Sequence, residues 1–410
     1  MQLYPEAESH LKSRRSSQIR RTGKFVRRYG DLEKYIEAAT AQFEKLLKEQ
    51  LARAEKMAAA EPPKDFASLD KITVGLCGGD GIGPIIMKEA RRLLAELLKD
   101  EIGSGKIVLR DIEGLTIENR LAKGEAVPAD VLADIKACDV ILKGPTTTPK
   151  GGTMESANVT LRRELDLYAN VRPVSVPEEG VDWMFYRENT EGEYTLGSKG
   201  IEIPGVLSMD FKVTTDCGTE RIARAAFEYA KNNGKTNVAI VTKANIMKKT
   251  DGKFSKICNE VAAQYPEIKA EDWYIDIMTA NLVNKAIRNQ FQVFVMPNLY
   301  GDIITDEAAE IQGGVGTAGS ANIGDRYAMF EAIHGSAPRM IEEGLADYAN
   351  PSSIFKAAEM LLRHIGLTAP ADRLAGALHT CCDTEKKMVV TGLADGATCK
   401  EFADYVMSKL

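Results

Sequence analysis

The sequence predicts an α/β fold in which a largely parallel sheet is covered by helices on both faces, with a helical N-terminal extension ahead of it. Short apolar, β-branched stretches alternate with amphipathic ones, which is the order typical of parallel strands joined by crossover helices. The chain has 410 residues, which at roughly 150 per domain predicts more than one domain. Hydrophobic residues make up 44% and charged residues 27%, a balance that excludes collagen-like and disordered proteins.

The N-terminal extension, residues 1–70, has two parts. Residues 11–28 carry several lysines and arginines with no acidic residue among them. From Leu32 onward, apolar residues recur at the 3.6-residue period of an amphipathic helix, which should end before Pro62. We favour packing of this extension on the protein's own oligomer; organelle targeting and a solvated arm are the alternatives. The cations are too few, and lack the interleaved aromatic residues, to indicate nucleic-acid binding.

The body begins with an alternating, β-branched stretch, residues 71–77, which predicts a strand. The glycine turn 78–84 (GGDGIGP) and a helix over residues 85–99 follow it, and the N–H groups of such a turn are able to meet an anion. The spacing of the turn is not G-x-G-x-x-G. That pattern occurs at residues 314–319, but residues 306–311 before it look helical, so a Rossmann fold is not predicted.

Further elements follow along the chain. Strands are predicted at residues 106–109, 140–143, 238–242 and 293–297, and helices include residues 220–232 and 253–264. No run of 18 or more apolar residues occurs, so no transmembrane helix and no membrane partner are expected. The net charge of −6 is too small to indicate nucleic acid as a partner.

Cysteine and histidine usage restricts the possible chemistry. The seven cysteines form no CxxC pair and are best interpreted as free thiols in a reducing compartment. This predicts a cytoplasmic protein and leaves the mitochondrial matrix open. Four histidines make a histidine-based metal site unattractive, so any metal should be held by carboxylates.

Arginines recur around short polar residues in the middle of the chain. Arg162, Arg172 and Arg187 suit a substrate with several carboxylates, because guanidinium groups pair bidentately with carboxylates. Ser156 and Asn158 stand two residues apart, and in an extended turn they would face one way and add neutral hydrogen bonds. The cluster predicts an anionic substrate site.

A second cluster is acidic. Asp302 and Asp306 follow an apolar strand and stand four residues apart. At a helix start both would lie on one face, a suitable arrangement for a hard divalent cation with oxygen ligands. A helix cap with a first-turn charge is the structural alternative.

From about residue 71 to residue 410, the chain resembles the isocitrate/isopropylmalate dehydrogenase family, and most of all its NAD-type isocitrate branch. The resemblance is carried by residues 79–84 (GDGIGP), 156–173, 187–194 (RENTEGEY), 243–248 (KANIMK), 298–306, 321–324 (ANIG) and 334–338 (HGSAP). It implies that family's two-domain fold rather than a Rossmann fold. The large domain would contain residues 71–167 and 313–410, and residues 168–312 would form the small domain with its dimer clasp.

The resemblance also implies roles for individual residues. Ser156 and Asn158 match the pair that contacts the distal carboxylate of isocitrate, where isopropylmalate enzymes place apolar residues. The arginines expected to hold the remaining carboxylates are Arg162, Arg172 and Arg187.

The metal ligands and proton-moving groups follow from the same resemblance. Asp302 and Asp306 match two ligands of Mg²⁺ or Mn²⁺, and the third, from a neighbouring subunit, maps to Asp276. Lys243 and Tyr194 match the Lys and Tyr that move protons. Because Lys243 and Asp276 are expected to reach into a partner's site, a homodimer or larger homo-oligomer with shared active sites is predicted.

The residues that match the family's cofactor contacts do not all indicate the same cofactor. His334, Gly335 and Asn350 match the region that holds the adenine, and Thr148 resembles a residue near the nicotinamide. Arg339 has the charge to receive the 2′-phosphate of NADP. The Tyr and Arg that NADP enzymes add from a later helix have no counterpart here, so NAD is predicted, with NADP as the alternative.

The combined prediction is metal-dependent oxidative decarboxylation of isocitrate, a tricarboxylate, to 2-oxoglutarate with hydride transfer to NAD. Oxidation of isopropylmalate or homoisocitrate is one alternative. A non-catalytic regulatory subunit of an isocitrate dehydrogenase is the other.

Overall fold

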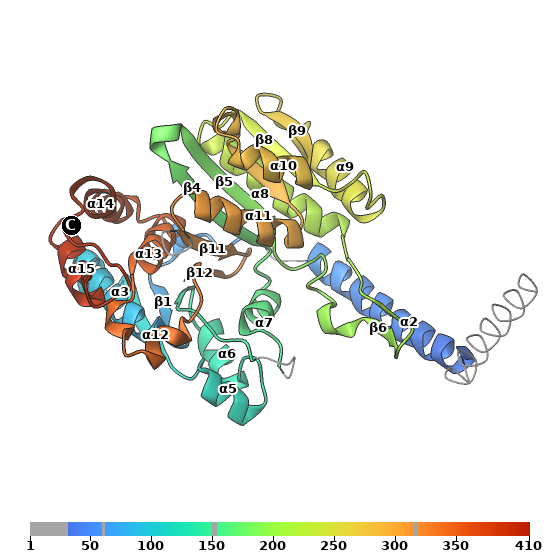
Figure 1. Ribbon diagram of the computed structural model, residues 1–410, viewed down its shortest axis with the longest axis horizontal. Helices are drawn as coiled ribbons and strands as arrows, with labels where there is room; N and C mark the ends of the chain where they lie inside the picture. Colours follow the sequence, from blue (N-terminus) through green and yellow to red (C-terminus); the bar gives the residue numbers. More distant parts are fainter. Residues whose placement is uncertain (1–31, 60–61, 150–153, 315–317) are drawn as a thin grey trace, which may run out of the picture. The chain divides into compact units, whose positions relative to one another are not determined.

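The computed structural model describes residues 32–59, 62–149, 154–314 and 318–410. They form two compact units, the smaller made of α2 (Leu32–Ala58) with Ser198–Asp210 and the larger of the remaining chain (Figure 1). The basic stretch, residues 11–28, lies outside the described residues. None of the helices in the described part of the chain has the length and apolar character needed to cross a bilayer.

In the smaller unit, α2 packs on the hairpin formed by β6 (Ile201–Ile203) and β7 (Leu207–Met209). The side chain of Gln42 donates to the backbone carbonyls of Lys199 and Gly200 at 2.9 and 2.8 Å. Leu46 is buried in the middle of the helix. The helical extension predicted from the sequence is therefore confirmed, including its end before the proline pair.

The larger unit is built on one ten-stranded sheet with the order β2-β1-β3-β12-β11-β4-β5-β10-β8-β9. Its strands are β1 (Ile72–Cys77), β2 (Ile107–Ile112), β3 (Val140–Lys143), β4 (Ala169–Val176), β5 (Val181–Glu188), β8 (Asn237–Thr242), β9 (Lys269–Tyr274), β10 (Val293–Met296), β11 (Gly319–Ile323) and β12 (Ala328–Ala332). The β12/β11, β11/β4 and β4/β5 pairs are antiparallel and the other neighbours are parallel. The largely parallel sheet is confirmed.

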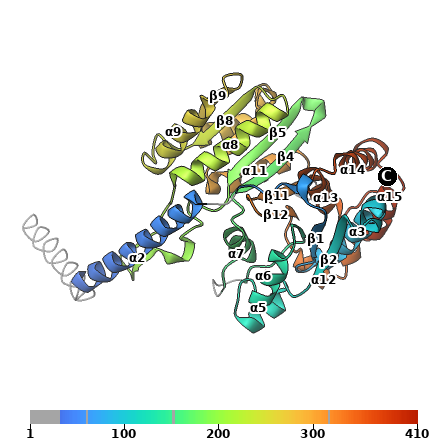
Figure 2. The same cartoon turned by 180° about the vertical axis from the view of Figure 1, so that it is seen from behind.

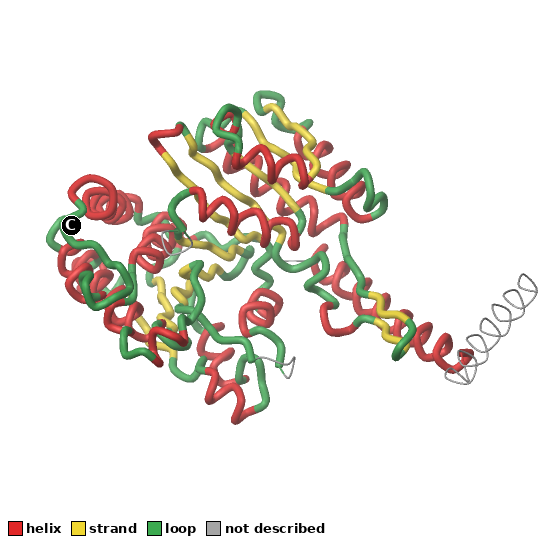
Figure 3. The backbone as a smooth tube through the Cα atoms, in the orientation of Figure 1, coloured by secondary structure: helices red, strands yellow, loops and turns green. Residues whose placement is uncertain are grey.

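Helices cover both faces of this sheet, as the red and yellow segments of Figure 3 illustrate. The longer ones are α3 (Gly83–Leu97), α5 (Ile117–Lys123), α6 (Ala129–Lys136), α7 (Ala157–Glu164), α8 (Asp216–Asn232), α9 (Thr250–Ala262), α10 (Ile275–Val283), α11 (Asn298–Ile311), α13 (Ser352–His364), α14 (Thr368–His379) and α15 (Cys399–Met407), and the short ones include α4 (Lys99–Gly103) and α12 (Pro338–Glu342). Figures 1 and 2 show α10 and α11 on one face of β5 and β10, with α8 and α9 on the other.

The hydrophobic core differs between the two faces. On one face, a single cluster of the described residues runs from α3, α13 and α15 to α8 and α9. On the other face the apolar residues form two separate clusters, one under α10 and α11 and one under α6 and α7. Between these two clusters, in the middle of the sheet, side chains of strands are free to be polar without breaking a core.

Most elements agree with the sequence prediction. The strand at residues 140–143 is confirmed to the residue, and the helix expected from residue 85 begins two residues earlier as α3, because Pro84 is tolerated in a first helical turn. In the ten-stranded sheet, the strands β4, β5, β9, β11 and β12 were not predicted. Each contains charged or polar residues, so none of them is a plain apolar run.

Two N–H groups of the glycine turn before α3 are used to hold neighbouring loops rather than left for an anion. The N–H of Asp80 donates to the carbonyl of Pro145 at 2.8 Å, and that of Ile82 to the carbonyl of Ser336 at 3.1 Å. Gly81 has φ +59°, and a Cβ there would lie 2.0 Å from the carbonyl oxygen of Ser336. The glycines thus let the turn approach two neighbouring loops, which the N–H groups of Asp80 and Ile82 hold. That the turn also meets an anion stays a prediction.

Candidate active site

A pocket of about 340 Å³ lies over the part of the sheet that neither of the two separate hydrophobic clusters covers. Its wall comes from α7 on one side and α11 on the other, and its floor comes from the central strands. The lining residues predicted from the sequence are Ser156, Asn158, Arg162, Arg172, Arg187, Tyr194, Asp302, Asp306, His334 and Gly335. The structure therefore brings together most of the predicted site.

Strand alternation places the charged floor of the pocket. Successive side chains of a strand point to opposite faces, so Arg172 shares a face with Val174, and Arg187 with Phe185. Glu331 of β12 is related in the same way to Met329 of the other cluster. The floor residues are therefore directed by the strands to the one part of the sheet that no apolar cluster covers.

Arg187 is the most deeply buried of the pocket arginines. It donates through Nε and Nη2 to the side-chain oxygen of Asn298, at 3.1 and 2.6 Å, and through Nη1 to Asp302. Burial, together with the charges of Arg162 and Arg172, lowers its pKa to about 10. It remains charged at neutral pH and its position is fixed.

Tyr194 completes this group by donating its hydroxyl to Asp302 at 2.7 Å. Burial and the hydrogen bond to the Asp302 carboxylate raise the pKa of Tyr194 to about 12. Burial alone would raise the pKa of Asp302, but the charges of Arg187, Arg172 and Arg162 and the hydrogen bond from Tyr194 outweigh it and lower that pKa. At neutral pH the pair is therefore a protonated phenol beside a carboxylate.

Asp306, the second aspartate, forms an ion pair with a different arginine. Arg172 donates through Nη1 to Asp306 at 2.8 Å and to the hydroxyl of Thr305 at 2.7 Å. Asp302 and Asp306 both stand on α11 and both line the pocket, which confirms the predicted arrangement on one helix face.

Ser156 and Asn158 line the pocket, but not as an extended turn. Ser156 is the N-cap of α7 and Asn158 lies in its first turn, so the extended arrangement expected from their spacing is wrong. The side chain of Ser156 makes no capping hydrogen bond to the helix. Asn158 accepts a hydrogen bond from the hydroxyl of Thr146 at 3.1 Å.

The sequence prediction missed a buried charge cluster beside Arg162. Glu331 lies 2.9 Å from the ammonium of Lys143 and 3.5 Å from Arg162, and it accepts a hydrogen bond from Asn322 at 2.7 Å. Burial opposes ionisation, but the two cations and the hydrogen bonds lower the pKa of Glu331 to about 2. The signal was a charged residue at the end of an apolar strand, since Lys143 closes the predicted strand 140–143.

Lys243 and Asp276 lie elsewhere on the larger unit and do not line the pocket in this chain. They form an ion pair of 2.6 Å, with side chains 25% and 59% exposed. The hydrogen bond from Lys243 lowers the pKa of Asp276. Their assignment to a neighbouring subunit's site stays a prediction.

The predicted cofactor residues are divided. His334 and Gly335 line the pocket; burial lowers the pKa of His334, so its ring is neutral at physiological pH. Thr148 is exposed, and Arg339 is 83% exposed with Nε donating to Glu343 at 2.7 Å. Neither belongs to the described residues that line the pocket.

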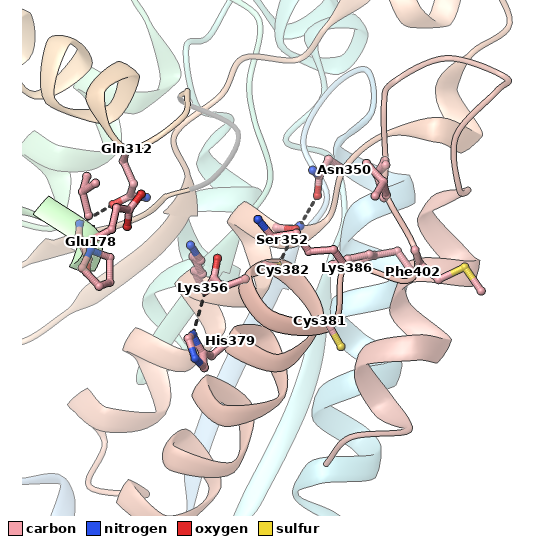
Figure 4. A pocket seen from close by; sticks show the side chains of 17 residues that line it. Glu178, Gln312, Asn350, Ser352, Lys356, His379, Cys381, Cys382, Lys386 and Phe402 are labelled. Carbon is pink, nitrogen blue, oxygen red and sulfur yellow. Dashed lines mark hydrogen bonds and ion pairs between the residues drawn. The ribbon is translucent and has the colours of Figure 1, made fainter.

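Asn350 lines a different, larger pocket of about 890 Å³, drawn in Figure 4. Its side-chain oxygen accepts the N–H of Ser352 at 2.9 Å. Ser175, which also lines this pocket, points to the opposite face of β4 from Arg172. Asn350 is therefore not brought together with the other predicted cofactor residues.

Comparison with known proteins matches this chain, over residues 73–406, to the model of the family described as isocitrate/isopropylmalate dehydrogenase. The chain belongs to the isocitrate/isopropylmalate dehydrogenase family. The match confirms the family predicted from the motifs. Because the matched range begins at residue 73, α2 lies outside it while β6 and β7 lie inside.

Relatives in this family carry both cofactor names. Subunit 2 of the mitochondrial NAD isocitrate dehydrogenase of Schizosaccharomyces pombe is 36% identical over 348 residues, covering 82% of this chain and 87% of the relative. The NADP isocitrate dehydrogenase of Rickettsia felis is 43% identical over 313 residues, covering 73% of this chain but 61% of the relative. The crystal structure of isocitrate dehydrogenase from Methylococcus capsulatus has a TM-score of 0.72 at 34% identity, covering 82% of this chain and 99% of that one.

Within this family framework, Asp302 and Asp306 fit a divalent cation in donor chemistry and in accessibility. Their side chains are 42% and 62% exposed, both line the pocket, and carboxylate oxygens are ligands that Mg²⁺ and Mn²⁺ prefer. In the part of the chain that the structure describes, no three His, Cys, Asp or Glu side chains form a metal-binding group. The third predicted ligand, Asp276, is paired with Lys243 instead.

Proposed function

We propose that this chain is an isocitrate dehydrogenase that oxidises and decarboxylates isocitrate to 2-oxoglutarate with NAD and a divalent cation. The observation that carries the proposal is a pocket in which Arg172 and Arg187 of the floor face Arg162, Ser156 and Asn158 of α7. Three guanidinium groups and three substrate carboxylates match in charge and in hydrogen-bonding geometry.

The arginines are held ready for such a substrate. Arg187 is fixed by Asn298 and Asp302, and Arg162 is oriented by the buried Glu331. Rigid, preoriented donors lose little entropy when an anion binds. Ser156 and Asn158 would hold the distal carboxylate that distinguishes isocitrate from isopropylmalate.

Asp302 and Asp306, with the partner subunit's Asp276, would hold Mg²⁺ or Mn²⁺. When bound, the cation stabilises negative charge on the substrate oxygens, and the nicotinamide of NAD accepts the hydride. Arg187 and Arg172, which pair with these two aspartates, would bind substrate carboxylates beside them.

Protons are assigned to Tyr194 and Lys243. Tyr194 is protonated at neutral pH, since its pKa is raised to about 12, and it would donate to the carbon that loses CO₂. Lys243, supplied by the partner subunit, would take the proton of the substrate hydroxyl. Asp302 accepts the hydrogen bond of Tyr194 and so orients its hydroxyl in the pocket.

NAD is favoured over NADP by the environment of Arg339. This residue, which has the charge for a 2′-phosphate, is engaged with Glu343 and exposed away from the pocket lining. The relatives include both cofactor types, so the choice rests on this position.

A homodimer with shared sites is supported by exposed apolar residues near the Lys243–Asp276 pair. Ile246 is 65% exposed in the turn after Lys243, and Ile277 is 49% exposed beside Asp276. Val283 is 55% exposed at the end of α10. Apolar residues grouped around a functional pair are typical of a surface covered by a partner.

The alternatives are a non-catalytic regulatory subunit and a dehydrogenase for isopropylmalate or homoisocitrate. A catalytic role is favoured because the chain contains Tyr194, Lys243 and both pocket aspartates. Isocitrate is favoured as the substrate because Ser156 and Asn158 are polar. We also propose a reducing compartment, because all seven cysteines are free thiols. The cytoplasm is the first choice, and the matrix is the alternative since the S. pombe relative is named mitochondrial.

The deciding experiment uses the purified full chain with isocitrate, homoisocitrate or isopropylmalate, each with NAD or NADP and with or without Mg²⁺. We expect NADH formation from isocitrate that a chelator abolishes, with a higher kcat/KM for NAD than for NADP. Absence of any activity at saturating metal would support the regulatory subunit. A preference for either other substrate would reassign the enzyme.

A further inference from the structure

A buried ion pair is joined to the main chain of Lys243. The ammonium of Lys212 lies 2.6 Å from the carboxylate of Asp251 and 3.4 Å from that of Glu193. Lys212 is 5% exposed and Asp251 is 0% exposed, so both charges are removed from water. Removing one partner of such a pair leaves a buried charge uncompensated, which is far costlier than losing an exposed pair.

Asp251 uses its other oxygen to hold the catalytic segment. Its Oδ2 accepts the backbone N–H of Lys243 at 2.7 Å. Lys243 is the first residue after β8, and Asp251 stands in the first turn of α9. The carboxylate therefore fixes the point from which the Lys243 side chain starts.

The same ammonium reaches two segments of the substrate pocket. Glu193 directly precedes Tyr194 in the sequence, and the Lys212 ammonium lies 4.3 Å from the centre of the Tyr300 ring, two residues before Asp302. The Lys212 ammonium thus contacts the three segments that carry Lys243, Tyr194 and Asp302. Lys212 itself is not one of the residues that line the pocket.

We propose that Lys212 is a positioning residue that holds these three segments in register, acting through Asp251, Glu193 and Tyr300. The proposal rests on the proposed function, because it assigns Lys212 to the groups that move protons and bind the cation in that reaction. Lys243 is expected to act in a second copy's site, whereas Tyr194 and Asp302 line this chain's own pocket. The Lys212 ammonium group would therefore link the two active sites of a dimer.

The test compares Lys212→Met, which keeps the length of the side chain without its charge, with Lys212→Arg, which keeps the charge. Lys64 offers a matched control in the same unit. Its ammonium lies 2.8 Å from Asp139, and the other oxygen of Asp139 accepts the backbone N–H of Thr73 at 2.8 Å. Lys64→Met removes the same kind of ion pair at a place that has no connection with the pocket.

We expect Lys212→Met to lower kcat for isocitrate by about 100-fold, the loss typical of a reacting group displaced by about 1 Å, while KM changes by less than about threefold. Lys212→Arg should recover most of that loss. Lys64→Met should lower the unfolding temperature but leave kcat within about twofold of the original protein.

Hydrogen exchange of the backbone over residues 243–252, measured without substrate, separates this proposal from the proposed function. Exchange should be faster in Lys212→Met and unchanged in Lys64→Met, whether or not the chain oxidises isocitrate. If the original protein proves inactive, the proposed function is refuted. The hydrogen-exchange comparison would still test whether Lys212 holds the segment 243–252. Unchanged exchange in Lys212→Met, or a kcat loss shared equally by Lys64→Met, would overturn the positioning role.

Discussion

Tyr194 donates its hydroxyl to Asp302 across 2.7 Å, and the same carboxylate accepts a hydrogen bond from Arg187. The hydroxyl is thereby directed into the pocket while its proton is retained. Replacing Tyr194 by Phe removes that proton together with the hydrogen bond to Asp302. We expect overall turnover to fall by at least about 100-fold, the low end of the range for loss of a proton donor.

The Tyr194→Phe variant should still reduce the keto acid formed in the first half-reaction, while its decarboxylation is impaired. The two half-reactions are measured separately, by NADH consumption and by CO₂ release. Tyr168→Phe is the control, because the hydroxyl of Tyr168 contacts Asp325 at 3.5 Å and does not line the pocket. Equal loss of both half-reactions in Tyr194→Phe would contradict the assigned role.

Substrate choice should depend on the N-cap of α7. Ser156→Leu places an apolar side chain where the distal carboxylate of isocitrate is expected, leaving that carboxylate without a partner. We expect kcat/KM for isocitrate to fall by at least about 100-fold and the ratio of isopropylmalate to isocitrate oxidation to rise. Ser175→Leu, in the other pocket, should leave the ratio unchanged, and a ratio unaffected by Ser156→Leu would remove Ser156 from the substrate site.

Acid stability should depend on Glu331. Its folded pKa of about 2 lies below the ordinary 4.5, so its stabilising effect is present above about pH 5 and is lost as the pH falls through 4.5 towards 2. Glu331→Gln should lower the free energy of unfolding at pH 7 by about 3 kcal/mol, because it leaves Lys143 buried without a counter-charge. It should also flatten the stability profile below pH 5.

Denaturant unfolding at several pH values tests this expectation. Glu385→Gln provides a control, since Glu385 also has its pKa lowered to about 2 by lysines but is more exposed. Its effect should disappear in about 1 M salt, where charges are screened within about 3 Å, whereas the effect at Glu331 should persist. A Glu331→Gln profile parallel to that of the original protein would contradict the prediction.

The glycine turn before α3 should be intolerant of a side chain at Gly81. In Gly81→Ala the new methyl group would meet the carbonyl of Ser336, which lies on the loop carrying His334. We expect destabilisation beyond the roughly 1–2 kcal/mol typical of a left-handed alanine, together with weaker NAD binding. Gly105→Ala has φ +79° and open space, so it should show the conformational cost alone. Equal losses in the two variants would refute the close-contact explanation.

The helical extension should contribute to assembly. Deleting residues 1–60 removes Gln42 from the carbonyls of Lys199 and Gly200, and it removes the exposed Phe43 and Leu47 that a second copy would cover. We expect a smaller species, or a weaker dimer, in sedimentation at equal concentration. An assembly unchanged by the deletion would refute this role.

The sequence predicted the parts of the site that are local. Asp302 and Asp306 are four residues apart on one helix, so their common face follows from helical periodicity alone. The ion pair between Arg162 and Glu331 could not be predicted from the sequence. The two residues are 169 positions apart, and the register of β12 decides their contact.

Tertiary contacts decided the local conformation in two places that the sequence described incompletely. Ser156 and Asn158 were expected in an extended turn, but a helix begins between them and packs Ala157 and Leu161 into the cluster beneath it. In the glycine turn, the N–H groups of Asp80 and Ile82 are accepted by the carbonyls of Pro145 and Ser336 rather than left for an anion. The partners of these groups lie far away in the sequence.

The placement of the pocket has a consequence for how this protein family changes its chemistry. Arg172 and Arg187 stand on strands whose other side belongs to the continuous core, so replacing the floor of the pocket requires refolding the centre of the molecule. Ser156 stands at the N-cap of α7, outside the apolar cluster beneath that helix. On the proposed function, new substrates would be acquired most easily by exchanging residues at the start of α7, while the demand for a carboxylate over the arginines would be inherited unchanged.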